Sequence, residues 1–343
     1  MKTKDPKFSI YSFQKKAENG SKQSELRVLG LPIWSTKTSF GKRETRMLGI
    51  KVICRKRKRS HGMTLGVSYN LYDGEELLEA SIKSIRNHVD YINVVYQNVS
   101  NTGEKRTGDL ADFLKPLLEK GLIDSTICYT PNLELKANKA VSNETLKRVI
   151  GMRDCKRHGC THFISMDVDE FFRGAELESA KRFINEHNIN VSAVSIIEYL
   201  KYPTVRLFYS RNINALDSSN PDEYEYFMPF ICKIPRFLRE TKRDMPPCFA
   251  DPTRFIVKKG KFWLFPKHEI AMHHMSTIRH DLDKKYRNSS CNDYINVKPA
   301  LQKLKESILQ FEPEKHRSLP NKIGFLGNFP FYIVDDEFGI GSV

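Results

Sequence analysis

Apolar residues along positions 63–343 follow two patterns, and together these predict alternating strands and helices. Residues 63–68, 91–96 and 122–129 are predicted to be strands, and the consecutive apolar positions that end at Met166 predict a strand covered on both faces. Apolar positions spaced by three or four residues predict helices after residue 74 and near 108–120, 143–158 and 297–311. The clearest stripe consists of Leu78, Ile82, Ile85 and Val89. Strands separated by helices of this length predict right-handed crossovers and a parallel sheet.

Three carboxylates, Asp167, Asp169 and Glu170, stand at the end of the fourth predicted strand. Ligands of parallel sheets bind at the carboxyl ends of the strands. Two aspartates spaced i and i+2 can present oxygens to one hard cation, which can then bridge phosphate oxygens. An isolated Asp-x-Asp is more commonly a solvated turn. Here the loops at 69–74 and 97–103 follow two other strands at the same edge, which favours a ligand site.

Charge divides the chain near residue 60. Residues 1–60 contain 17 Lys and Arg against 4 Asp and Glu, a net charge of +13, whereas residues 61–343 contain 39 against 37, a net charge of +2. The basic part also contains a short repeat, because residues 26–34 align with residues 45–53 at an offset of 19. Each copy predicts one short strand, and the two copies could pair as a hairpin.

The second copy of the repeat runs into five consecutive basic residues at 55–59. Because apolar residues such as Trp34 and Ile50 accompany this run, residues 26–59 are predicted to dock on an anionic membrane surface, with each basic residue contributing about 1 kcal/mol. The alternative is a solvated linker or a flap packed on the domain, since charge runs usually mark solvated segments. Against nucleic acid as a partner, the run has no recognition helix and no aromatic-studded sheet motif.

The chain has no run of about 18 apolar residues, and its N-terminus lacks the apolar core of a signal peptide. The sequence therefore predicts a cytoplasmic protein, which the basic segment would hold at the inner face of the cytoplasmic membrane. The seven cysteines are odd in number and irregularly spaced, which favours reduced thiols. A zinc site at Cys155, His158, Cys160 and His162 is disfavoured, because a helix-to-strand transition would separate these side chains.

Four features stand together within residues 63–280: Asn70 and Asp73 after the first strand, Ser100 and Asn101 after the second, Arg148, Gly151, Arg153 and Gly159 along one helix, and the acidic sequence at 166–172. This combination resembles nucleotide-sugar-dependent glycosyltransferases of the GT-A fold, particularly the bacterial family 2-like enzymes that build surface polysaccharide. The resemblance implies one α/β nucleotide-binding domain, with a mostly parallel central sheet flanked by helices. We accordingly expect a basic extension (1–60), a catalytic domain (61–290) and a C-terminal helix and tail (291–343).

The resemblance also implies which residues form the donor site. Asn70 and Asp73 fall where such enzymes hold the nucleobase and ribose of a nucleoside diphosphate sugar, and Asn101 is a further candidate for binding the donor. Arg148 or Arg153 would neutralise the diphosphate, although long basic side chains on a helix are mostly exposed.

The same resemblance implies a metal site for Mn²⁺ or Mg²⁺. Asp167 would lie near the ribose or the metal, Asp169 would ligate the metal, and His273 or His274 would complete the site. The alternative for either histidine is a half-buried structural role, because imidazole is only a secondary ligand of hard cations. Three basic residues that follow closely could hold phosphate: Arg279, Lys284 and Lys285.

Transfer of a sugar also requires a general base within hydrogen-bond reach of the acceptor hydroxyl. The first candidate is Glu198, which ends an apolar strand at 194–197. Asp244 and Asp251, in the proline-rich stretch 243–251, are the next candidates. Each of these acids alone is more commonly a surface or capping residue.

The sequence therefore predicts a metal-dependent glycosyltransferase that moves a sugar from a nucleoside diphosphate sugar, most simply a UDP-sugar, to a lipopolysaccharide or another glycan or lipid-linked acceptor. A nucleotidyltransferase acting on sugar phosphates is the enzymatic alternative, but it would carry a Gly- and Arg/Lys-rich loop where Asn70–Asp73 stands. The non-enzymatic alternative is a nucleic-acid-binding protein that uses the basic N-terminus.

Overall fold

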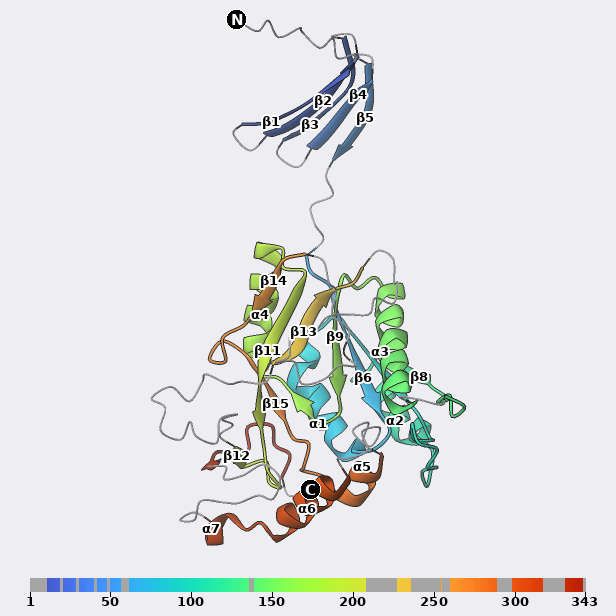
Figure 1. Cartoon of the computed structure of the whole chain (residues 1–343), viewed down its shortest axis with the longest axis vertical. Helices are drawn as coiled ribbons and strands as arrows, with labels where there is room; N and C mark the ends of the chain where they lie inside the picture. The colour runs from blue at the N-terminus through green and yellow to red at the C-terminus, as the bar shows by residue number, and fades with distance from the viewer. Residues whose placement is uncertain are drawn as a thin grey trace, which may run out of the picture. The chain divides into compact units, whose positions relative to one another are not determined.

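The computed structural model of the chain contains two compact units, Met1–Gly62 and Met63–Val343 (Figure 1). In the first unit, the backbone is described for residues 11–18, 21–28, 31–39, 42–47 and 50–56. Beyond these strands, the described residues are 62–135, 139–207, 227–235, 254, 260–288, 298–316 and 331–341. The domain boundaries expected at residues 60 and 290 stay predictions.

The first unit is a five-stranded antiparallel sheet in chain order. Its strands are β1 (Tyr11–Glu18), β2 (Ser21–Val28), β3 (Leu31–Ser39), β4 (Lys42–Met47) and β5 (Ile50–Lys56). Leu26 pairs with Trp34 across β2 and β3, and Thr45 pairs with Ile53 across β4 and β5. Each copy of the repeat therefore spans two strands, and the prediction of one strand per copy was wrong. Each copy contains a central glycine, and glycine commonly interrupts a strand pattern.

The second unit is built on one large sheet with the strand order β10-β15-β11-β13-β9-β6-β7-β8, and β14 also pairs with β11. Its strands are β6 (Leu65–Leu71), β7 (Tyr91–Tyr96), β8 (Ser125–Cys128), β9 (His162–Asp167), β10 (Glu170–Phe171), β11 (Val191–Glu198), β13 (Phe227–Lys233), β14 (Phe262–Leu264) and β15 (Ala271–His274). As predicted, β9, β6, β7 and β8 are parallel neighbours. The whole sheet is mixed, where a mostly parallel one was predicted, because β13 lies antiparallel between β9 and β11.

Helices separate these strands along the chain. They are α1 (Glu75–Ile85) with the short helix η1 (Arg86–His88), α2 (Leu110–Glu119), α3 (Lys139–Arg157), α4 (Gly174–His187), α5 (Leu282–Asn288), α6 (Lys298–Gln310) and α7 (Pro313–His316). The four helices predicted from apolar spacing are confirmed as α1, α2, α3 and α6. Two short strands, β12 (Val205–Leu207) and β16 (Phe331–Ile333), pair separately. Among the described helices, none has the length and apolar character needed to cross a membrane.

The two faces of the parallel strands differ in character, because successive residues of a strand point to opposite sides. On one face, Val67 and Tyr69 of β6 belong to the main apolar core, which also contains buried residues of α1, α2 and α4. The other face of β6 carries Gly66, Ser68 and Asn70, and it lies against α3 (Figure 1). The face beneath α3 is therefore small and polar rather than apolar.

Glycine allows α3 to approach this polar face closely. A Cβ on Gly151 would lie 2.6 Å from Ser68 Cβ and 3.2 Å from Asn93 Oδ1. Asn93 Nδ2 also donates to the Gly151 carbonyl oxygen at 3.0 Å. One helical turn earlier, Lys147 and Arg148 are both buried. The helix therefore brings two cationic side chains to the sheet.

The cysteine and histidine residues near the end of α3 serve packing. Cys155 and Cys160 are buried free thiols that lie together against Gly66. His158 stacks on the Tyr91 ring at 4.3 Å between centroids, so its ring is occupied by an aromatic partner. These contacts hold the C-terminal end of α3 on the sheet.

Candidate active site

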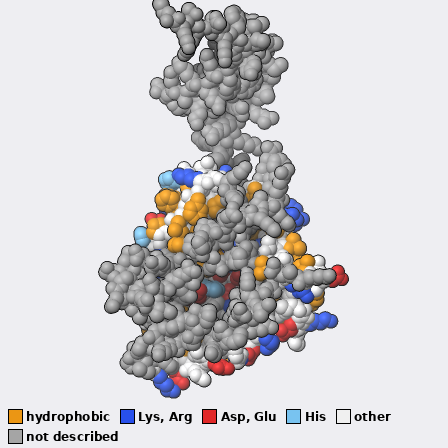
Figure 2. All heavy atoms as spheres, in the orientation of Figure 1, with side chains coloured by type: hydrophobic (Ala, Val, Ile, Leu, Met, Phe, Trp, Pro, Cys, Tyr) orange, Lys and Arg blue, Asp and Glu red, His pale blue; other side chains and the backbone are white. Residues whose placement is uncertain are grey.

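A two-residue turn carries the acidic sequence between distant parts of the sheet. β9 ends at Asp167 and β10 begins at Glu170, yet β13, β11 and β15 separate the two strands in the sheet order. The sheet must therefore curl around the turn, across which the Asp167 backbone N–H donates to Glu170 Oε2 at 3.0 Å. On the face drawn in Figure 2, acidic and histidine side chains are visible close together.

Asp167 is held by polar side chains from three segments. Its Oδ2 accepts hydrogen bonds from Arg148 at 3.0 Å and from Arg254 at 3.2 Å, and its Oδ1 lies 3.4 Å from Asn70 Nδ2. Burial would raise the pKa of this carboxyl, but the two guanidinium groups outweigh burial and hold the pKa well below its usual range. Asp167 therefore stays ionised, with both oxygens engaged by the chain itself.

The two arginines also brace the strand end on either side of Asp167. Arg148 is completely buried and donates to Ser165 Oγ at 2.9 Å and to Glu144 Oε1 at 2.6 Å. Arg254 donates to the Ser165 carbonyl oxygen at 2.5 Å and to the Glu170 carboxylate. Burial raises the pKa of Glu170 to about 7, although Arg254 opposes this shift. The turn is thus fixed by charged groups that are largely removed from water.

Asp169 accepts hydrogen bonds from a second pair of cations. Its Oδ2 lies 2.5 Å from Arg279 Nη2 and 2.8 Å from Lys285 Nζ. Burial would raise the pKa of Asp169, but Lys285 and Arg279 lower it well below its usual range. Arg279 also lies 3.2 Å from the Asp73 carboxylate and covers Gly74, whose φ of +77° and missing Cβ leave room for the guanidinium group. The loop after β6 therefore joins the site through Arg279.

The other oxygen of Asp169 faces His274, with 3.9 Å between Oδ1 and Nε2. Across the ring, Nδ1 lies 2.9 Å and 3.0 Å from the two oxygens of Glu198, because β11 and β15 run parallel with these residues opposite each other. Burial disfavours a charge on this imidazole, but Glu198 and Asp169 outweigh burial and raise the pKa of His274 to about 9. A carboxylate that holds one ring nitrogen fixes the direction of the other, as is common for metal-binding histidines.

These side chains fit a divalent cation that takes most of its ligands from a substrate. Asp169 Oδ1 and His274 Nε2 offer one carboxylate and one imidazole on either side of a short gap. Within the residues that the structure describes, no group of three or more His, Cys, Asp or Glu is arranged to hold a metal. Mg²⁺ is usually bound through one or two carboxylates together with substrate phosphates. A diphosphate would therefore have to supply the remaining ligands.

The adjacent histidine lies in a different environment, because successive residues of β15 point to opposite sides. His273 is completely buried, its Nδ1 is hydrogen-bonded to the Tyr199 hydroxyl at 2.8 Å, and its ring meets the Phe338 ring. Burial lowers the pKa of His273 to about 3. Of the two predicted metal ligands, the structure brings His274 to Asp169 and leaves His273 in the apolar interior.

The remaining predicted residues lie in three different places. Arg153 is exposed, because five helical positions turn it away from the buried arginine of α3. Asn101 is buried in the loop after β7, where its Oδ1 accepts a hydrogen bond from Gln97 at 3.2 Å. Asp244 and Asp251 lie outside the described residues.

Sequence reasoning missed two cationic residues of the site, Lys147 and Arg254. The burial of Lys147 was not predicted, because a Lys-Arg pair on a helix is ordinarily exposed to solvent. The signal that could have revealed it is the pattern of α3, whose buried positions include the polar residue Asn143 beside Lys147 and Arg148. Arg254 has no comparable signal, since nothing in its spacing from the acidic turn indicates that the two meet.

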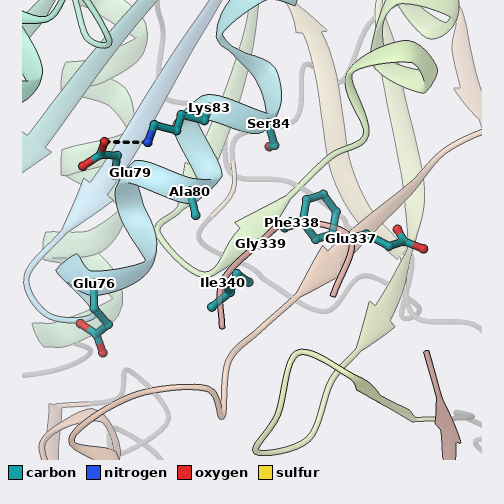
Figure 3. A pocket seen from close by; sticks show the side chains of 9 residues that line it. All are labelled: Glu76, Glu79, Ala80, Lys83, Ser84, Glu337, Phe338, Gly339 and Ile340. Atoms are coloured by element: carbon teal, nitrogen blue, oxygen red, sulfur yellow. Dashed lines mark ion pairs between the residues drawn. The ribbon is translucent and has the colours of Figure 1, made fainter. Parts of the chain in front are cut away.

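A groove of about 510 Å³ lies between α1 and residues 337–340 (Figure 3). Three of its four charged side chains are paired, because Glu79 lies 2.9 Å from Lys83, and Glu337 lies 2.5 Å from Arg173. The fourth, Glu76, accepts a hydrogen bond from the His280 backbone N–H at 3.1 Å. The groove thus offers a ligand little uncompensated charge. We therefore assign the candidate active site to the acidic turn.

Comparison with known proteins finds remote likenesses. No family model and no curated protein matches the sequence. TarS 1–349 from S. aureus is 11% identical, with a TM-score of 0.33 and 76% of each chain covered. The same protein in complex with UDP is 16% identical, with a TM-score of 0.28, and the match spans 40% of this chain and 36% of that one. GalNAc-T7 with UDP, GalNAc and Mn²⁺ is 11% identical, with a TM-score of 0.37, and the match spans 72% of this chain and 50% of that one.

These solved structures are GT-A-type glycosyltransferases. The chain spans about a third of the length of the TarS complex with UDP, at 36%. Because every identity is below 25% and every TM-score is below 0.5, we base the function on the residues of the site itself.

Proposed function

We propose that this chain is a metal-dependent glycosyltransferase that moves a sugar from a nucleoside diphosphate sugar, most simply a UDP-sugar, to a lipopolysaccharide or another surface glycan. The observation that supports it best is the meeting of Asp169 with His274 at the carboxyl ends of β9 and β15, with Arg279 and Lys285 on the same carboxylate. A carboxylate and an imidazole suit a metal, and the two fixed cations suit phosphate oxygens.

In this proposal, Asp169 and His274 hold Mn²⁺ or Mg²⁺, and Glu198 orients the imidazole through Nδ1. When bound, the metal supplies Lewis-acid stabilisation of the charge on the departing diphosphate. Asp167, predicted as a metal or ribose residue, serves instead as the anchor for Arg148 and Arg254. Its two oxygens are already engaged, so we do not include it among the metal ligands.

Arg279 and Lys285 are the chain's own means of stabilising the leaving group. The Arg279 side chain is nearly buried beside Asp169, whereas the Lys285 side chain is 21% exposed. Arg279 Nε has no hydrogen-bond partner within the described part of the chain. Cations that are fixed before the reaction need no reorganisation as negative charge develops, and they act strongly where water is excluded. We propose that both side chains donate to the diphosphate oxygens of the donor.

The general base remains a choice among the predicted acids. Glu198 was the first candidate, but both of its oxygens lie within 3.0 Å of His274 Nδ1. We therefore propose an orienting role for Glu198, and Asp244 and Asp251 keep their place as candidates for the base that takes the acceptor proton. A base must lie within hydrogen-bond reach of that proton.

We also propose that residues 26–59 hold the chain at an anionic membrane surface, where a lipid-linked acceptor resides. The net charge of +13 on residues 1–60 supports this role. Co-sedimentation with phosphatidylglycerol-containing vesicles should be strong for the full chain and weak for residues 63–343. Equal binding of the two proteins to the vesicles would reject this role. Loss of vesicle binding at moderate salt would indicate that the interaction is electrostatic.

The main test measures turnover of a panel of UDP- and GDP-sugars, with and without Mn²⁺, for the native chain and for Asp169→Ala. We expect turnover of a UDP-sugar that requires Mn²⁺ and is lost in the variant. The exposed Lys115→Met provides a matched control, because it changes a charged residue on α2 that is exposed to solvent. Metal-independent turnover that survives Asp169→Ala would reject the proposed mechanism.

A further inference from the structure

Lys147 is a buried cation whose charge the described chain does not neutralise by direct contact. The residue is 5% exposed and lies on α3, one position before Arg148. Within the described residues, its ammonium group makes no hydrogen bond and no ion pair. The other cations at the acidic turn each contact a carboxylate: Arg148, Arg254, Arg279 and Lys285. Lys147 is therefore the exception in an otherwise paired site.

The carboxylates near Lys147 are committed to other cations. Glu144, Asp167 and Asp73 all act on its charge from beyond contact distance, and they oppose the burial that lowers its pKa. Arg148 forms ion pairs with Glu144 and Asp167, and Arg279 forms an ion pair with Asp73. Burial of an ammonium group is unfavourable unless a partner compensates it. A ligand that contacts this ammonium group would supply such a partner.

A second open polar group lies on the same face of the sheet. Asn70 donates from Nδ2 toward Asp167, but its buried Oδ1 has no hydrogen-bond partner among the described residues. The surroundings of Asp167 thus offer one open donor, the Lys147 ammonium, and one open acceptor, the Asn70 amide oxygen. A nucleotide carries both complements, since its phosphate oxygens accept and its ribose hydroxyls and base N–H groups donate.

We propose that the Lys147 ammonium binds a phosphate oxygen of the nucleoside diphosphate, while Asn70 Oδ1 accepts from the nucleoside; this inference rests on the proposed donor function. The role that the sequence suggested for Arg148 or Arg153 thereby passes to the neighbouring lysine. Arg148 has no comparable freedom, because Ser165, Glu144 and Asp167 already hold its guanidinium group.

The proposal makes opposite predictions for stability and binding. Lys147→Met fills nearly the same volume and removes the buried charge, so the thermal unfolding midpoint without ligand should stay equal or rise. UDP affinity should fall, on the order of 10- to 100-fold, because a hydrogen bond to a charged group is lost. Lys115→Met is the matched control, since the same change at an exposed position of α2 should alter neither quantity.

The experiment combines isothermal titration calorimetry with thermal unfolding of the full chain, using uridine, UDP and inorganic pyrophosphate as probes in the presence of Mg²⁺. We expect Lys147→Met to weaken UDP and pyrophosphate, whereas uridine is unchanged. Equal UDP binding by the native chain and the variant would overturn this inference alone. So would a fall of several degrees in the unfolding midpoint, because a structural lysine would then explain the burial. A native chain that binds neither UDP nor pyrophosphate would overturn the proposed function, and this inference with it.

Discussion

Replacing Gly151 with alanine should push α3 away from the sheet face that carries the site. The added Cβ would overlap Ser68 Oγ and lie 2.6 Å from Ser68 Cβ, at a buried contact between helix and strand. Asn93 holds the same helical turn through the Gly151 carbonyl oxygen at 3.0 Å. The helix would have to retreat as a body, and Arg148, one turn earlier, would move with it.

Two opposing effects decide the size of the loss. Alanine is favoured over glycine inside a helix by about 1 kcal/mol. Overpacking of a buried contact costs about 1–3 kcal/mol. The hydrogen bonds of Arg148 to Ser165 at 2.9 Å and to Asp167 at 3.0 Å would also weaken, and a hydrogen bond to a charged group contributes about 1.5–3 kcal/mol. We therefore expect a net destabilisation of about 1–3 kcal/mol.

Urea unfolding followed by circular dichroism measures this loss as a lower midpoint at unchanged slope. Ser68→Gly supplies the rescue, because it removes both atoms that the new Cβ would meet, and the Ser68 hydroxyl has no partner within the described residues. The double variant with Gly151→Ala should recover most of the loss, with a coupling energy of about 1 kcal/mol or more. Additive losses, or a Gly151→Ala chain as stable as the native one, would refute the close approach.

Two further predictions concern histidines. Glu198→Gln should weaken Mn²⁺ binding in the presence of UDP by about 10- to 100-fold, because His274 loses the carboxylate that orients it. His273→Ala should lower stability and leave Mn²⁺ affinity unchanged, because His273 is buried away from the site. Calorimetry that finds the same change in Mn²⁺ affinity for both variants would contradict the assignment. Burial, with Lys233 nearby, lowers the pKa of His162 to about 4, so the stability contributed by the neutral imidazole is complete above pH 6.5 and is lost as the pH falls toward 4. His162→Gln should reduce the pH dependence of the free energy of unfolding over this range by up to about 1 kcal/mol per pH unit, and urea unfolding curves that give the same pH dependence for both proteins would refute this.

The parallel half of the sheet was predictable because strand and helix patterns alternate along residues 63–167. The mixed half was not, since β13 (Phe227–Lys233) pairs on both sides with strands that are distant in sequence. Apolar content indicates that such a segment is buried, but it carries no information on direction. The same limit applies to the repeat, where pairing between Leu26 and Trp34 shows that an apolar run with a central glycine can hold two strands.

The residue types of the site were more predictable than their partners. The Asp-x-Asp turn and the histidine pair were apparent from the order of residues in the sequence. The choice of His274 over His273 follows from the side of β15 on which each lies, and the contact with Glu198 follows from strand pairing across 76 residues of sequence. Likewise, Lys147 and Arg148 are adjacent in sequence, but only the packing of α3 shows that the arginine is fully paired and the lysine is not.

The polar face beneath α3 connects these observations. Ser68 Oγ and Asn93 Oδ1 are buried there without partners among the described residues, and each such group costs about 1–3 kcal/mol. An apolar helix over an apolar face would avoid that cost, as α1 does on the opposite side through Leu78 and Ile82. This cost is explained if evolution keeps the polar face because the adjacent strand ends bind a ligand, so that some stability is lost in favour of binding. On this reasoning, Lys147 belongs with the serine and the asparagine: all three are less well satisfied in the isolated chain than a core residue would be.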